Sequence, residues 1–147
     1  MPLRMWQNQP ILIVNTATQC TYKNQFRDLQ MLYNEYKEGG LQIIAVPSND
    51  FGELEPWDDE LIAHFCESNY ALKFPMTSKQ HVIGADAHPL FYQIVQSFGA
   101  SYEPKWNFQK YLFDRTGELI DGWPAAISPT DPVITHNIER NLNSWLI

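Results

Sequence analysis

Short apolar runs and amphipathic stretches alternate along the first third of the chain. Residues 11–14 (ILIV) form a continuous apolar run, which is typical of a strand buried on both faces. Apolar residues then recur every three or four positions, which predicts a helix over about residues 23–37 that ends at the glycine pair 39–40. A second apolar run, residues 42–46 (QIIAV), predicts another strand. Together these elements predict a right-handed βαβ unit with parallel strands.

Turn-forming residues separate the elements that we expect in the rest of the chain. Residues 47–57 (PSNDFGELEPW) predict a loop, after which Asp58 or Asp59 can cap a helix to about residue 70. Residues 74–76 (FPM) predict a short extended segment, whereas residues 97–105 show no clear pattern. The later elements are a helix over residues 88–96, a hairpin of strands 109–113 and 119–123 around DRTG, and a last helix that Asp131 caps and Pro132 begins.

This order of elements predicts a thioredoxin-like α/β fold, in which a central mixed β-sheet has helices on both faces. The 147 residues suit one domain over residues 1–147. Hydrophobic residues make up 44% of the chain and aromatic residues 14%, which indicates a globular protein rather than a disordered one.

Charge and cysteine content narrow the classes of function. The net charge of -7 argues against general nucleic-acid binding, because phosphate contacts need a basic face. No apolar run approaches the roughly 20 residues of a membrane span, and MPLRMWQNQP lacks the apolar segment of a secretory signal. Two cysteines are too few for a secreted disulfide scaffold, so we expect a reducing cytoplasm.

Cys20 lies in the loop between the first predicted strand and the first predicted helix. Catalytic groups tend to lie at the carboxyl ends of strands in open α/β sheets. A helix N-terminus offers free N–H groups and partial positive charge, which favour a nucleophilic thiolate. A lone cysteine is also commonly a small buried hydrophobe, so the pattern leaves both interpretations open. Cys66 falls on the apolar stripe of the helix that ends near residue 70, and there the pattern alone favours a core position.

Seven segments that together span nearly the whole chain match one protein family in the order of that family. They are VNTATQC (14–20), PSNDFG (47–52), EP (55–56), FC (65–66), FPM (74–76), AHPLF (87–91) and KWNFQKYLFDRTG (105–117). On these segments the chain resembles the glutathione peroxidase family, specifically its bacterial-like, cysteine-using, thioredoxin-dependent two-cysteine branch. The resemblance implies a thiol peroxidase that reduces hydrogen peroxide and organic hydroperoxides without a cofactor or a metal ion.

The same resemblance implies roles for individual residues. Cys20 takes the position of the peroxidatic cysteine, and Cys66 that of a resolving cysteine, which condenses with the sulfenic acid to form a disulfide. Trp106 and Asn107 fall on the WNF motif, whose N–H donors can stabilise a thiolate and orient the peroxide. We expect the reduced protein to hold the two sulfurs apart, so that the helix ending near residue 70 unwinds locally during the cycle.

Asp50 is the main departure from the family pattern, because it replaces a glutamine that donates a hydrogen bond. An ionised carboxylate cannot donate, and its charge disfavours a nearby thiolate. Asp50 could therefore accept the proton of the thiol, or it could point away from the thiol, with Trp106 and Asn107 as the remaining hydrogen-bond donors. A second departure is the N-terminus, because the family usually carries a strand hairpin ahead of residue 11; the fold is therefore expected to be shortened there.

The resolving cysteine favours thioredoxin as the reductant, with glutathione as the other option. The family's tetramer-forming loop is lacking between residues 97 and 105, which favours a monomer or a loose dimer.

A peroxide sensor that relays its disulfide to a partner would use the same residues and remains an alternative function. Residues 20–23 lack the second cysteine of CxxC, which disfavours a disulfide reductase. The histidines have no recognisable partners, which disfavours a Cys–His hydrolase or a metal site; they are His64, His81, His88 and His136.

Overall fold

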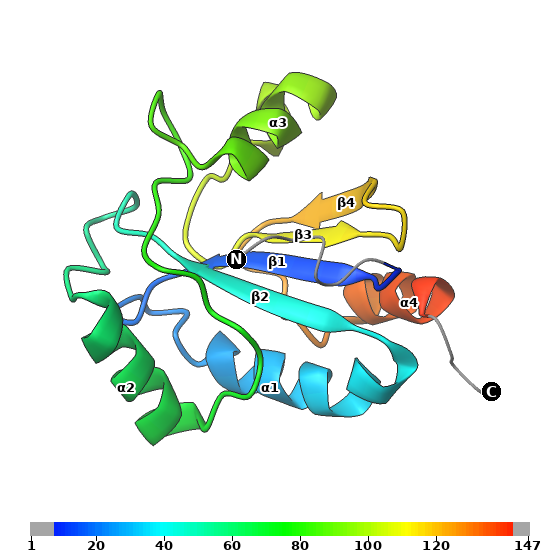
Figure 1. The fold of residues 1–147 in the computed structure, drawn as a ribbon, viewed down its shortest axis with the longest axis horizontal. Helices are drawn as coiled ribbons and strands as arrows, with labels where there is room; N and C mark the ends of the chain where they lie inside the picture. The colour runs from blue at the N-terminus through cyan, green and yellow to red at the C-terminus, as the bar shows by residue number, and fades with distance from the viewer. Residues whose placement is uncertain (1–7, 143–147) are drawn as a thin grey trace.

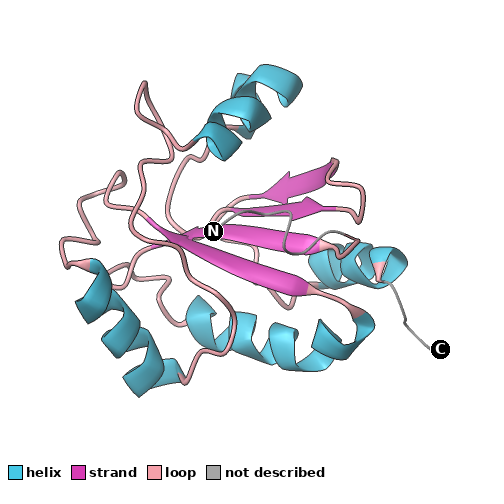
Figure 2. Ribbon diagram, viewed as in Figure 1, coloured by secondary structure: helices cyan, strands magenta, loops and turns pink. Residues whose placement is uncertain are grey.

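The computed structural model, which describes residues 8–142, contains a four-stranded mixed sheet in the order β2-β1-β3-β4 (Figure 2). The central strand β1 pairs in parallel with β2 and antiparallel with β3, which pairs antiparallel with β4. The strands are β1 (Ile11–Thr16), β2 (Gln42–Pro47), β3 (Lys110–Phe113) and β4 (Leu119–Trp123). The expected mixed sheet is confirmed. The expected N-terminal shortening concerns a segment whose first seven residues lie outside the described part of the chain.

Helices cover both faces of the sheet, as the sequence predicts. Figure 1 shows α3 on one face and α1 and α4 on the other, with α2 next to α1. The helices are α1 (Gln25–Tyr36), α2 (Asp59–Tyr70), α3 (Pro89–Phe98) and α4 (Pro132–Asn141), with short 3₁₀ turns η2 (Lys37–Gly39) and η3 (Ala100–Tyr102). Both predicted acidic caps form: Asp58 accepts from the N–H of Leu61, and Asp131 from that of Val133, each at 2.9 Å. No helix in residues 8–142 is long and apolar enough to cross a membrane.

The residues of β1 alternate between two hydrophobic cores. Leu12 and Val14 pack in the core beneath α1, α2 and α4, whereas Ile11 and Ile13 pack in the core beneath α3. All six residues of β1 are buried, which confirms the interpretation of its apolar run. Burial of each apolar side chain of β1 contributes about 1.5–3 kcal/mol to folding. The carboxyl ends of β1 and β2 are therefore held rigidly at the end of the sheet from which the loops after them emerge.

Two local features differ from the sequence expectation or refine it. The first helix begins at Gln25, about two residues later than predicted, because the residues after Cys20 form successive turns. The extended segment at residues 74–76 forms as expected and runs beside β2: Ala45 donates to the carbonyl of Pro75 at 3.1 Å and accepts from Thr77 at 2.9 Å. That segment covers β2 on the side away from β1.

Candidate active site

Cys20 lies in the turn that joins β1 to α1, and only 1% of its surface is exposed. The backbone N–H of Tyr22 donates to its sulfur at 3.4 Å, and no other hydrogen bond within residues 8–142 reaches this atom. The carbonyl of Cys20 accepts from Lys23 at 3.0 Å, which closes the turn. Because α1 begins only at Gln25, the turn and not the helix supplies the N–H that can stabilise a thiolate.

The buried carboxylate of Glu55 fastens the Cys20 loop to the loop after β2. It accepts two hydrogen bonds from Thr18, one from the backbone N–H at 2.9 Å and one from the hydroxyl at 2.6 Å. Gln19 adds a backbone bond to the carbonyl of Leu54 at 3.1 Å. Burial raises the pKa of Glu55, and the Thr18 bonds and the charge of Lys79 offset part of that rise. The sequence marked Glu55 only as part of a family motif and gave no signal for this contact.

Removal of the Glu55 carboxylate should loosen the loop that carries Cys20. We expect Glu55→Ala to lower the free energy of unfolding by about 2–4 kcal/mol, because both Thr18 donors then lose their buried partner. Glu55→Gln is the matched control, since its side-chain oxygen can still accept one of the two bonds and should cost less. Urea unfolding followed by circular dichroism measures both variants. Equal stability of Glu55→Ala and the wild type would contradict this role.

The WNF segment is fixed against the carboxyl end of β1. The side-chain amide of Asn15 donates to the carbonyl of Trp106 at 2.9 Å, and the backbone carbonyl of Asn15 accepts from Phe108 at 2.6 Å. Trp106 is 39% exposed, whereas Asn107 is fully buried. The amide of Asn107 donates to the carbonyl of Phe51 at 3.2 Å and not to the sulfur of Cys20. The structure thus places both WNF residues against the loop after β2 and shows no hydrogen bond from either to Cys20.

Phe51 and Gly52 form the surface on which Trp106 rests. The rings of Phe51 and Trp106 have centroids 5.9 Å apart. Gly52 has a φ of +69°, and a Cβ atom there would lie 3.1 Å from the Cη2 atom of Trp106. Only glycine suits both the left-handed backbone and the close ring contact. We refer to Phe51 and Gly52 together as the Trp106 seat.

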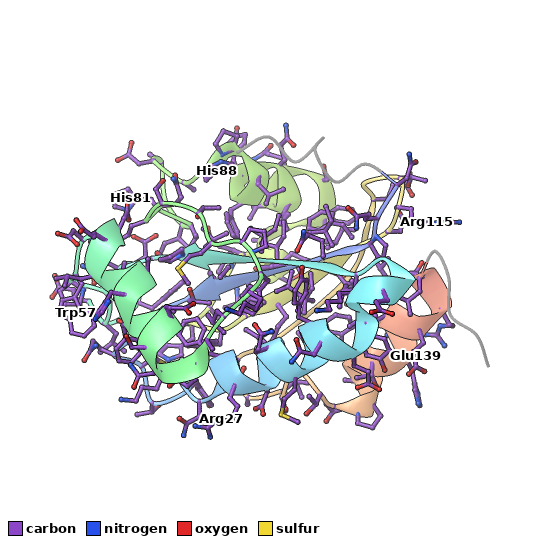
Figure 3. All side chains as sticks on the ribbon, turned by 60° about the horizontal axis from the view of Figure 1, so that its bottom comes forward. Arg27, Trp57, His81, His88, Arg115 and Glu139 are labelled. Carbon is purple, nitrogen blue, oxygen red and sulfur yellow. The ribbon has the colours of Figure 1, made fainter. Side chains whose placement is uncertain are left out.

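Asp50, just before this seat, is engaged by a different loop. Its carboxylate lies 2.8 Å from Nδ1 of His81 and accepts backbone bonds from Val82 at 2.6 Å and Ile83 at 3.3 Å. The expectation that no histidine has a partner is therefore wrong for His81. It failed because the two residues are 31 positions apart on separate loops, and no sequence period relates loops. Figure 3 shows His81 and Trp57 at one end of the molecule and Arg115 at the other.

Cys66 lies on the inner face of α2 beside Ile62, and it is 2% exposed. This agrees with its position on the apolar stripe, although Leu61 of the same stripe is exposed. Burial, and to a smaller extent the charge of Glu55, raise the pKa of Cys66 to about 12. Both Cys20 and Cys66 are free thiols in one hydrophobic cluster. Within residues 8–142, no group of three or more His, Cys, Asp or Glu side chains is arranged to hold a metal ion.

Comparisons with known proteins identify the family of the chain. The sequence model described as glutathione peroxidase matches residues 1–95. The glutathione peroxidase homolog BsaA of Halalkalibacterium halodurans is 41% identical over 126 residues, which cover 84% of this chain and 80% of the relative. The glutathione peroxidase-like peroxiredoxin gpx1 of Schizosaccharomyces pombe is 37% identical over 148 residues, which cover 99% and 89%.

A solved structure shows the same fold. The crystal structure of T. cruzi GPX1 superposes with a TM-score of 0.76 at 26% identity, covering 100% of this chain and 90% of that one. The family match, the sequence identity over most of the chain and the shared fold lead to one conclusion. The chain belongs to the glutathione peroxidase family and is a thiol peroxidase.

Proposed function

We propose that residues 1–147 act as one domain that reduces hydrogen peroxide and organic hydroperoxides with Cys20 as the peroxidatic thiol and Cys66 as the resolving thiol. The observation that carries this proposal is the placement of both free thiols in one buried cluster, Cys20 in the turn after β1 and Cys66 on the buried side of α2. A relative of 37% identity carries the name peroxiredoxin, which fits a thiol mechanism. Both free cysteines fit a reducing cytoplasm.

The proposed cycle has three steps. The Cys20 thiolate attacks one peroxide oxygen, so that an S–O bond forms, the O–O bond breaks and water or an alcohol leaves with a proton. Cys66 then loses its proton and attacks the Cys20 sulfenic acid, which forms the disulfide and releases water. A dithiol reductant finally reduces the disulfide by exchange and becomes oxidised itself.

Trp106 and Asn107 are the proposed donors for the peroxide step. Trp106 is partly exposed next to the Phe51–Gly52 seat, so that its indole can meet a small substrate arriving from solvent. The Asn107 amide is bonded to the carbonyl of Phe51 at 3.2 Å, a long bond that a developing negative charge could replace. Asp50 faces the loop of residues 81–83, which favours the second of its two options, namely that it points away from the thiol.

Movement of α2 is the proposed route to the disulfide. In the packed state Cys66 is buried and its pKa is raised to about 12, so that its thiol is almost fully protonated near neutral pH. Local unwinding would bring Cys66 into water, remove the effect of burial and let its Cα approach that of Cys20 to within about 7 Å. The left-handed Ala71 at the end of α2, with φ of 50°, is a point at which such unwinding could begin.

A comparison of two reductants tests this function. We expect NADPH-coupled turnover of hydrogen peroxide and tert-butyl hydroperoxide with thioredoxin and thioredoxin reductase to exceed that with glutathione and glutathione reductase by at least about tenfold, because a dithiol resolves a protein disulfide in one exchange sequence. Size-exclusion chromatography of the same sample reports whether the enzyme is a monomer or a loose dimer. Faster turnover with glutathione would overturn the proposed two-cysteine cycle.

A further inference from the structure

The side chain of Asp50 joins two loops that are far apart in the sequence. Three groups of the loop between α2 and α3 converge on its carboxylate: Nδ1 of His81 and the backbone N–H groups of Val82 and Ile83. The Asp50 side chain is only 10% exposed, whereas that of His81 is 65% exposed. The Asp50 carboxylate is thus largely shielded from water, and His81 is the one of its three partners that exchanges protons with solvent.

The residues that follow Asp50 support the proposed peroxide donors. The carbonyl of Phe51 receives the amide of Asn107, and the ring of Phe51 contacts that of Trp106. The backbone of Gly52 lies against the edge of the same indole. A shift of Asp50 would therefore move the Trp106 seat, and with it both residues of the WNF motif.

We propose that His81 is a positioning residue of the peroxidase reaction: its bond to Asp50 holds the Trp106 seat, so that the reactivity of Cys20 toward peroxide depends on the charge of His81. The proposal rests on the proposed function, in which Trp106 and Asn107 assist Cys20. His81 thus becomes part of the site because its partner, Asp50, replaces the glutamine of the family.

The pH dependence of this pair follows from its contacts. The Asp50 hydrogen bond and charge raise the pKa of His81, and Asp86 of the same loop raises it further. Burial raises the pKa of Asp50, but the bonds from His81, Val82 and Ile83 outweigh it and leave that pKa lowered. Two other titratable side chains belong to the same segment: that of His88, whose backbone N–H donates to the carbonyl of His81 at 2.8 Å, and that of Lys79, whose ammonium donates to the carbonyls of Glu55 and Trp57.

The raised pKa of His81 and the lowered pKa of Asp50 determine the pH range in which both side chains are charged. Because the folded pKa of His81 is raised, the charged pair is fully formed below the ordinary histidine pKa of about 6.5 and is lost as the pH rises through the raised value. The lowered pKa of Asp50 keeps its carboxylate ionised throughout the neutral and mildly acidic range. The seat is therefore held most firmly on the acid side of neutrality, and its hold weakens on the alkaline side.

The test is the rate constant for oxidation of reduced enzyme by hydrogen peroxide, measured by stopped-flow tryptophan fluorescence from pH 5.5 to 9. The ratio of the wild-type constant to that of His81→Gln cancels the titration of the Cys20 thiol. We expect a ratio of about three to ten near pH 6, well below the roughly hundredfold cost of a 1 Å misplacement, and a fall toward one at alkaline pH. His136→Gln, at an exposed position on α4, is the matched control and should give a ratio of one at every pH.

Two further variants separate a charge-dependent role from a structural one. His81→Lys keeps a positive charge above pH 8, so its rate constant should exceed that of the wild type there. In Asp50→Asn, the NMR signal of the His81 C2 proton should titrate at a lower pH than in the wild type, because the carboxylate that raises the pKa of His81 is gone. A ratio for His81→Gln that is one, or that is constant with pH, overturns the proposal.

Failure of the proposed function gives a different result. If Cys20→Ser still reacts with peroxide, the proposed function is wrong, and the His81 titration still reports whether the pair exists. If Cys20→Ser is inert and the His81→Gln ratio stays at one, only the positioning role is wrong.

Discussion

Cys20→Ser should lose peroxide turnover almost completely, by at least about 10⁴-fold in kcat/KM, because a serine hydroxyl is neither ionised nor readily oxidised at neutral pH. Cys66 cannot take its place in the packed protein, since it is buried on α2 and its pKa is raised to about 12. Thioredoxin-coupled consumption of hydrogen peroxide, with thioredoxin in excess, measures the loss directly.

The fold of Cys20→Ser must be shown to be intact for that result to count. Serine is close to cysteine in size, its hydroxyl oxygen can still accept from the N–H of Tyr22, and the N–H of Lys23 donates to the backbone carbonyl of residue 20 and not to the side chain. Matching circular dichroism spectra and unfolding midpoints would therefore show that the loss is chemical. His64→Gln, at an exposed position on α2, serves as the control for substitution and should keep full activity. A folded Cys20→Ser with more than about 1% of wild-type turnover would point to a different nucleophile.

The sheet and its helices could be predicted from the sequence because each has a local signal. The run at residues 11–14 indicated a buried strand, and the structure confirms that β1 is buried on both faces. Asp58 and Asp131 marked two helix starts correctly, because capping depends on a side chain and the N–H groups within the next turn. The sequence predicts the start of α1 about two residues too early, because the residues that form the turns after Cys20 carry no strong turn signal.

The site was harder to predict, because its contacts join loops. The sequence could place Cys20 at the end of a strand, but it could not show that Glu55 holds the Cys20 loop through Thr18 or that Asp50 meets His81. These partners lie between 31 and 37 positions apart, and no periodicity connects them. The contact of Glu55 with Thr18 follows from the parallel pairing of β1 and β2, which brings the loops after both strands to the same end of the sheet. The contact of Asp50 with His81 joins the loop after β2 to the segment between α2 and α3.

Those loop contacts change how the departure at Asp50 is understood. A carboxylate beside the Cys20 thiol would disfavour the thiolate, but the Asp50 carboxylate is engaged by His81 and by the backbone N–H groups of Val82 and Ile83, which stabilise its charge away from Cys20. The substitution of a glutamine by Asp50 thus comes with its own compensation in the loop at residues 81–83.

Cys66→Ser should separate the two halves of the cycle. We expect thioredoxin-supported turnover to fall by about 100-fold or more, because the Cys20 sulfenic acid then has no internal thiol with which to condense. The rate constant for the first reaction with peroxide should stay within about twofold of the wild type, since Cys66 lies on α2 and takes no part in the turn around Cys20. Stopped-flow fluorescence measures the first step and the coupled assay measures the whole cycle.

The fate of the sulfenic acid gives the second measurement. In Cys66→Ser, dimedone should label Cys20 after one equivalent of peroxide, and excess peroxide should add two oxygen atoms to that residue, as seen by mass spectrometry. In the wild type the same treatment should instead give a Cys20–Cys66 disulfide, and the amides of α2 should exchange with deuterium faster than in the reduced protein. Unchanged exchange in α2 would mean that the two thiols meet without unwinding. Full turnover of Cys66→Ser with thioredoxin would mean that Cys66 is only a core residue, and that the reductant attacks the Cys20 sulfenic acid itself.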